Sequence, residues 1–199
     1  KEWATTSFDE NNEHRHLSHL YGVWPLFETQ GNEKLSKACE QAIANRQSEN
    51  EASHALVHRS LIASRLKDSD SLTDALVKLM NHKIRYDSLM TNHDYDQGSC
   101  YCTDFAIGYL GIINEALVYS HNDDIEFLPA LPNSGFENGT LKGIKTRNRA
   151  TVTELKWADG GKTISATVTS DIDQKLNIKV GGKSQTVEFK AGESKTFKF

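Results

Sequence analysis

The sequence predicts a mainly α-helical first part, residues 1–124, followed by a small antiparallel β-sandwich, residues 125–199. Three observations support this prediction. Between residues 32 and 119 apolar residues recur at intervals of three and four, as on one face of a helix. Beyond residue 132 they alternate with polar residues, as in half-buried strands. Pro129 and Pro132 lie between the two patterns, where helical periodicity ends.

Four segments of the first part have helical spacing. The segment 55–66 is apolar on more than one side, as expected of a helix packed between others. The segment 105–119 contains Gly108 and Gly111, which predict close packing against neighbouring backbone. Two further helices are predicted by apolar stripes, one of Leu35, Ala38, Cys39, Ala42 and Ile43, the other of Leu72, Ala75, Leu76, Leu79 and Met80.

The second part reads as short strands separated by turns. Asp159-Gly160-Gly161 has the composition of a hairpin turn. Trp157 lies in an alternating run, which favours a core position over a surface on which a sugar stacks. The predicted strands are 141–146, 150–157, 163–169, 175–180, 186–189 and 195–199.

Composition excludes several classes of protein. With 23 basic and 27 acidic residues the chain has a net charge of -4, which offers no positive field for nucleic acid or an anionic membrane. No apolar run is long enough to cross a membrane, and residues 1–3 lack the apolar stretch of a signal peptide. The spacing of Cys100 and Cys102 is too tight for an easy disulfide, and we expect the three cysteines, Cys39 included, to be buried thiols rather than metal ligands.

The densest polar cluster is the segment 13–25, Glu-His-Arg-His-Leu-Ser-His-Leu-Tyr-Gly-Val-Trp-Pro. His16 and His19 would share a face of a helix, and His14 and His16 a face of a strand, so metal binding is one interpretation. Neither geometry gathers all three side chains. A second interpretation is that they cap a helix and bond to backbone.

The third interpretation, a sugar-binding site, is the one we favour. A neutral, hydroxyl-rich ligand needs rigid hydrogen-bonding groups beside an aromatic face. The cluster offers His14, Arg15 and His16 for the first purpose, and the planar fork of Arg15 can address two ring hydroxyls at once. Trp3, Tyr21 or Trp24 can supply the aromatic face.

A second polar cluster, residues 92–104, leads into the last predicted helix, with Asp104 at its N-cap. One interpretation is that Asp104 only accepts bonds from the first backbone amides. The other is that the same donors and the positive helix end keep its carboxylate ionised, as a general base requires.

The segment from His14 to Pro25 strongly resembles the His-Arg-His-x-Ser-His-Leu-Tyr-Gly-x-x-Pro segment of glycoside hydrolase family 95, the inverting α-L-fucosidases and related α-L-galactosidases. Glu2-Trp3 is similar to the family's Glu-Trp element. Residues 127–132, Phe-Leu-Pro-Ala-Leu-Pro, are similar to the element that precedes its C-terminal β domain.

The resemblance implies that the helical part is a portion of an (α/α)6 toroid. It also implies that Asp104 is the general base, in a family pattern like Ile-Asp-Gly-Asn-Phe-Gly-Gly. This chain departs from that pattern after Asp104, where it reads Phe-Ala-Ile-Gly, and it has Ser53-His54-Ala55 where the family has Gly-Trp-Ser.

In the family the general acid, a Glu, precedes the Glu-Trp element. The resemblance therefore implies that the acid lies in the remainder of a parent polypeptide, before Lys1. It also implies a glycan substrate, a secreted or periplasmic location, and no metal or other cofactor. The rival interpretations are a non-catalytic structural or carbohydrate-binding remnant, and another sugar enzyme, such as a lyase, on an α/α toroid.

Overall fold

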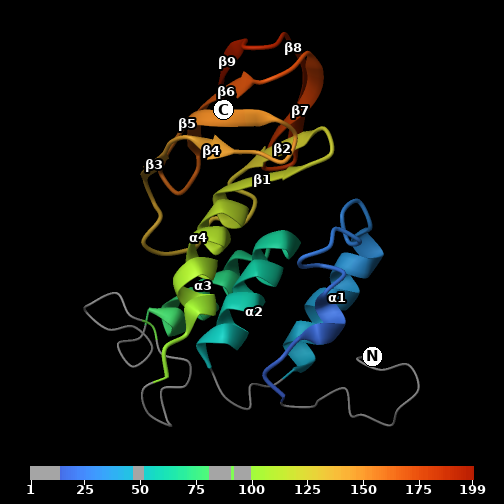
Figure 1. Ribbon diagram of the computed structural model, residues 1–199, viewed down its shortest axis with the longest axis vertical. Helices are drawn as coiled ribbons and strands as arrows, with labels where there is room; N and C mark the ends of the chain where they lie inside the picture. The colour runs from blue at the N-terminus through green and yellow to red at the C-terminus, as the bar shows by residue number, and fades with distance from the viewer. Residues whose placement is uncertain (1–13, 47–51, 81–90, 92–99) are drawn as a thin grey trace. The chain divides into compact units, whose positions relative to one another are not determined.

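The computed structural model describes residues 14–46, 52–80, 91 and 100–199. They form helices followed by strands (Figure 1). The chain divides into two compact units between Ile112 and Ile113, whereas the sequence placed the division between residues 124 and 125. Strands β1 (Val118–His121) and β2 (Asp124–Phe127) belong to the second unit, because β1 pairs with β2 and β2 with a strand fifty residues later in the chain.

The described part of the helical unit confirms the four helices that the apolar spacing predicts. A 3-10 turn, η1 (Ser18–Leu20), precedes them. Asn32 Oδ1 accepts a hydrogen bond from Leu35 N (3.1 Å) where the first helix begins, so one amide that lacks a partner within the helix is satisfied. The helices are α1 (Glu33–Asn45), α2 (Ser53–Leu66), α3 (Ser69–Leu79) and α4 (Thr103–Leu117).

Helix α2 is enclosed by its neighbours, as its all-round apolar pattern predicts. Every residue from Ser60 to Leu66 is buried. The hydroxyls of Ser60 and Ser64 donate to the carbonyls one turn earlier, each at 2.8 Å, which satisfies these polar groups inside the core. Helix α3 packs against α2, and Ile62 and Leu66 of α2 share a core cluster with Cys39 and Ile43 of α1.

Helices α2 and α4 approach each other closely at the glycines of α4. A Cβ atom added at Gly108 would lie 2.7 Å from Val57 Cγ1, and one added at Gly111 would lie 3.9 Å from Leu61 Cδ2. The step from Gly108 to Gly111 in α4 matches the step from Val57 to Leu61 in α2. The two helices therefore run in the same direction, with their N-termini at the same end. The packing is close at Gly108, as predicted, but the neighbouring atoms at both glycines belong to side chains rather than to backbone. The contacts place the first turn of α4 near the first turn of α2.

The second unit contains two sheets among its described residues. One has the strand order β1-β2-β7-β8, and the other has the order β3-β5-β6-β9 with β4 paired to β5. The strands beyond β2 are β3 (Gly139–Leu141), β4 (Ile144–Lys145), β5 (Ala150–Ala158), β6 (Thr163–Ser170), β7 (Gln174–Val180), β8 (Lys183–Phe189) and β9 (Ser194–Lys198).

The prediction of an antiparallel sandwich was wrong in one respect, because the first sheet is mixed. Strands β2 and β7 pair in parallel, with Ile125 opposite Ile178. Parallel neighbours need a long crossover, and here the chain between Phe127 and Gln174 supplies it by forming β3 to β6 of the other sheet. The alternation of apolar and polar residues shows which face of a strand is buried. It does not show whether the neighbouring strand is parallel or antiparallel.

One hydrophobic core takes residues from both sheets, including Phe127 and Ile178 from the first and Leu155 and Val168 from the second. Trp157 belongs to it, as predicted: it is 7 % exposed, and its Nε1 donates to the Phe136 carbonyl oxygen at 2.7 Å. A buried indole N–H needs such an acceptor, so Trp157 is a structural residue.

The cysteines only partly follow the prediction of buried thiols. Cys39 and Cys102 are buried, but Cys100 is exposed, and none of the three forms a disulfide. Cys100 precedes α4 and is not covered by a helix face. None of the helices in the described part of the chain has the length and apolar character needed to cross a membrane.

Candidate active site

The segment 14–25 is held in place by its own apolar residues. Leu17, Leu20 and Val23 are buried in the same cluster as residues of α1 and α2. Backbone bonds from Leu20 N to Leu17 O and from Val23 N to Leu20 O, both 2.9 Å, wind the segment into successive turns. The segment is therefore neither the helix nor the strand that the two metal-binding geometries required.

Two buried arginines donate hydrogen bonds to the backbone of this segment. Arg46, just after α1, donates from Nη1 to the carbonyl oxygens of His14 (2.9 Å) and His16 (3.3 Å). Arg65 of α2 donates from Nη1 to the carbonyls of Val23 (3.3 Å) and Leu26 (2.8 Å). The guanidinium of Arg65 also lies over the rings of Trp24 (4.5 Å) and Phe27 (3.8 Å). These hydrogen bonds to carbonyl oxygens hold the backbone of the segment in place.

Two histidines of α2 lie beside this segment. The ring of His16 lies edge-on to the rings of His14 (5.1 Å between centroids) and His54 (5.4 Å). One turn further along α2, His58 contacts the ring of Tyr21 (5.5 Å) and donates from Nε2 to the Trp24 carbonyl oxygen (3.4 Å).

Two of these imidazoles have a lowered pKa, which favours their neutral form. Burial lowers the pKa of His16, and the neighbouring charges of Arg15 and His54 lower it further. Burial also lowers the pKa of His58, against the opposing effect of its bond to Trp24. A neutral imidazole can donate one hydrogen bond and accept another, which suits an uncharged ligand.

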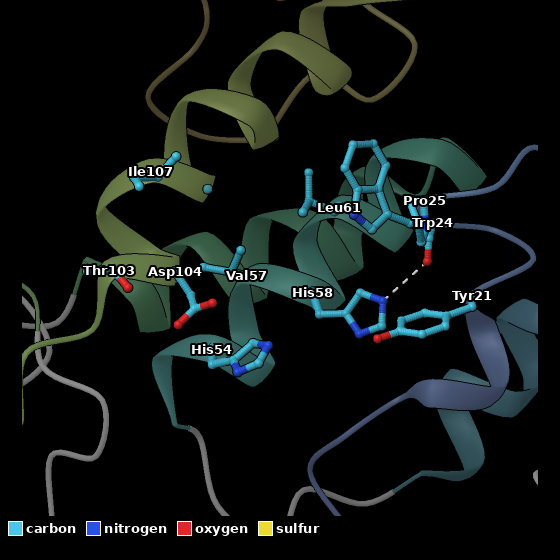
Figure 2. Close-up of a pocket in the computed structure, with 11 residues that line it drawn as sticks. Tyr21, Trp24, Pro25, His54, Val57, His58, Leu61, Thr103, Asp104 and Ile107 are labelled. Carbon is cyan, nitrogen blue, oxygen red and sulfur yellow. Dashed lines mark hydrogen bonds between the residues drawn. The ribbon is translucent and has the colours of Figure 1, made fainter.

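A pocket of about 580 Å³ opens beside these histidines (Figure 2). Its volume is within the range of small-molecule sites. Polar groups gather where α2 and α4 begin, and apolar side chains line the pocket one to two turns further along both helices. The lining residues are Tyr21, Trp24, Pro25, His54, Val57, His58, Leu61, Thr103, Asp104, Ile107 and Gly108.

Asp104 lies in the first turn of α4, one residue inside the helix rather than at the N-cap that the sequence predicted. The helix begins earlier because Cys102 is anchored: its N donates to Thr91 O (3.0 Å), and its O accepts from Thr91 Oγ1 (2.5 Å). Among the described residues, the carboxylate of Asp104 receives one hydrogen bond, from Cys102 Sγ to Oδ2 at 3.8 Å. Oδ1 is therefore available to a water or a hydroxyl in the pocket.

The structure brings some of the predicted site residues together. Asp104 lines the pocket with Tyr21 and Trp24, two of the predicted aromatic candidates. His14, Arg15 and His16 do not line it, although His16 contacts the pocket residue His54. Trp3 lies outside the described residues.

Sequence reasoning missed His54 and His58 as pocket residues. Their spacing of four within a predicted helix places both on one face, so this signal was present in the sequence. In the described part of the chain, no group of three His, Cys, Asp or Glu side chains is arranged to hold a metal ion.

Comparison with known proteins places this fold and pocket in a family. A solved structure described as a kojibiose phosphorylase from the human microbiome matches 87 % of this chain and 23 % of its own, with a TM-score of 0.50 and 17 % identity, which is a likeness of fold alone. Residues 1–117 match the Glycosyl hydrolase family 95 catalytic domain, and residues 119–199 match the Glycoside hydrolase family 95, C-terminal domain. The chain belongs to glycoside hydrolase family 95.

Two relatives resemble the chain over most of its length. Alpha-L-fucosidase 2 of Arabidopsis thaliana is 29 % identical over 172 residues, 80 % of this chain and 20 % of that protein. Probable alpha-fucosidase A of Aspergillus oryzae is 28 % identical over 193 residues, 85 % of this chain and 26 % of that protein. The chain thus spans a fifth to a quarter of the length of these relatives.

Proposed function

We propose that this chain is part of a glycoside hydrolase that cleaves α-L-fucosyl or related α-L-galactosyl linkages with inversion. Asp104 acts as the general base and draws a proton from the attacking water. The observation that carries the proposal is the position of its carboxylate, which is exposed in a pocket with Oδ1 unoccupied by protein donors among the described residues. The names of the two relatives and the family membership support the choice of sugar.

The fold that we propose for the complete enzyme is an (α/α)6 toroid followed by a β-sandwich. Helices α1 to α4 would supply part of the toroid, and the two sheets with their shared core would form the sandwich. The remaining helices would come from the rest of the parent polypeptide.

Inversion needs a second carboxylic acid. One group protonates the leaving oxygen while the other activates water on the opposite face of the sugar, across a gap of ~6.5 to 9.5 Å. Asp104 cannot perform both tasks. We propose that a Glu upstream of this chain is the general acid.

Substrate binding is assigned to His14, Arg15, His16 and Trp3. The support for His14 and His16 is their position: Arg46 fixes the backbone of both residues, and the ring of His16 touches the pocket residue His54. This arrangement makes the side chains rigid, as recognition of hydroxyl groups requires.

The base assignment is tested by Asp104→Asn in the protein as its gene encodes it. An amide cannot accept the proton, so we expect kcat to fall by about 10²- to 10⁴-fold while KM changes by less than about threefold. Steady-state hydrolysis of 4-nitrophenyl α-L-fucoside gives both constants. Asp70→Asn is the matched control, because Asp70 is also the second residue of a helix, α3, and does not line the pocket. Unchanged turnover in Asp104→Asn would exclude Asp104 as the base.

The role of Arg15 is tested by Arg15→Lys. Lysine keeps the charge but loses the planar fork, so we expect KM to rise by about five- to tenfold with kcat largely retained. Arg149→Lys, in the turn before β5, serves as the control. An unaltered KM in Arg15→Lys would return the segment 14–19 to a purely structural role.

A further inference from the structure

We infer that His54 is a sugar-contacting residue, whose imidazole bonds a substrate hydroxyl beside Asp104. The inference rests on the proposed function and adds a binding residue at a position where the sequence pattern departs from its family.

The first step is the placement of His54 at the polar end of the pocket. It is the second residue of α2, as Asp104 is the second residue of α4. The parallel contact of the two helices through Val57 and Gly108 brings these two first turns to the same end of the pocket. Figure 2 shows the carboxylate of Asp104 and the imidazole of His54 at this end, with His58 further along α2.

The second step is that His54 has hydrogen-bonding capacity to spare, whereas His58 does not. His58 uses Nε2 on the Trp24 carbonyl oxygen and packs against Tyr21. His54 is exposed, and no described residue makes a hydrogen bond to its imidazole. A ligand in the pocket would therefore meet a free donor and a free acceptor on His54.

The third step is that the ring of His54 is oriented by the protein. The ring of His16 lies edge-on to it at 5.4 Å, and Arg46 fixes the backbone of His16 through its carbonyl oxygen. A side chain that is oriented in advance loses little freedom when a ligand binds. His54 thus has the position, the free bonding groups and the rigidity of a sugar contact.

The experiment compares His54→Ala and His54→Gln in the protein as its gene encodes it, with 4-nitrophenyl α-L-fucoside as the probe. Loss of one neutral hydrogen bond corresponds to about a 3- to 12-fold rise in KM for His54→Ala. Glutamine retains a donor and an acceptor at a similar reach, so His54→Gln should stay within about twofold. His121→Ala, outside the pocket, is the control and should leave KM unchanged.

If His54 had a purely structural role, His54→Ala would have a lower melting temperature, but its KM would not rise more than that of His54→Gln. Thermal unfolding is therefore measured for each variant. If His54→Ala does not fold, His54→Leu replaces it, because leucine matches the bulk of glutamine without its polar groups. An unchanged KM in an active, folded His54→Ala variant overturns the inference alone, as does an equal rise in KM for Ala and Gln. If the unsubstituted protein does not hydrolyse the fucoside, the proposed function falls together with the inference.

Discussion

At the scale of residues, the candidate site depends on buried arginines that bond to the backbone and on polar side chains that line the pocket. Arg46 and Arg65 use their guanidinium groups on carbonyl oxygens of the segment 14–26. His54, His58 and Asp104 are the polar groups left to face the cavity.

The half-buried His58 makes stability depend on pH. The pKa of His58 is lowered in the folded state, chiefly by burial, so its protonated form is disfavoured there. Below about pH 6.5 the unfolded chain takes up the proton first, and the free energy of unfolding falls as the pH drops toward the folded-state pKa. Above that pH the contribution is fully present.

We therefore expect the melting temperature to fall between pH 7 and pH 5, and to fall less steeply in His58→Gln, which has no proton to gain. Calorimetry across this range, in buffers of equal ionic strength, measures both slopes. Identical slopes for the two proteins would contradict the assignment of this effect to His58.

Only some of the residues of the candidate site could be predicted from the sequence. Asp104 was found because it opens a predicted helix after a polar loop, and it does line a pocket. His54 was not found, because its relevance depends on α2 and α4 lying side by side, a tertiary contact that no local pattern encodes. The N-cap position was assigned two residues too late, since the bonds between Thr91 and Cys102 that precede the helix join residues eleven apart.

At the scale of elements, prediction succeeded wherever one face of a segment meets a core. The stripe from Leu35 to Ile43 gave α1, and alternation gave β5 and β6. It failed for β1, whose first two residues were included in the last predicted helix, and for β2, where no strand was predicted. Their strand conformation comes from pairing with each other and with β7, a long-range contact.

The contact between α2 and α4 gives a prediction at this scale. In Gly108→Ala the new methyl group meets Val57, so overpacking of about 1–3 kcal/mol opposes the ~1 kcal/mol by which alanine favours a helix. We expect a lower melting temperature, and Val57→Ala in the same chain should restore it.

Gly111→Ala is the matched control, because its methyl group would make only ordinary contact with Leu61 and should keep or raise the melting temperature. Differential scanning calorimetry measures all four proteins. If Gly108→Ala were as stable as Gly111→Ala, the helices would not be as close as the structure places them.

At the scale of the whole molecule, the chain joins a helical unit that carries a pocket to a β unit with its own core. The matches to the two family 95 domains follow the same order along the chain. The two relatives are about four times as long as this chain. Composition and periodicity identified both units, but the family was recognised from the segment His14 to Pro25.

The central claim is hydrolysis with inversion, in which Asp104 delivers water to the face opposite the leaving group. Proton NMR of the first sugar released from an α-L-fucoside, recorded before the anomers equilibrate, tests it most directly. The account predicts β-L-fucose as the first product, and loss of that signal in Asp104→Asn. α-L-Fucose as the first product, or an unsaturated product of elimination, would contradict it.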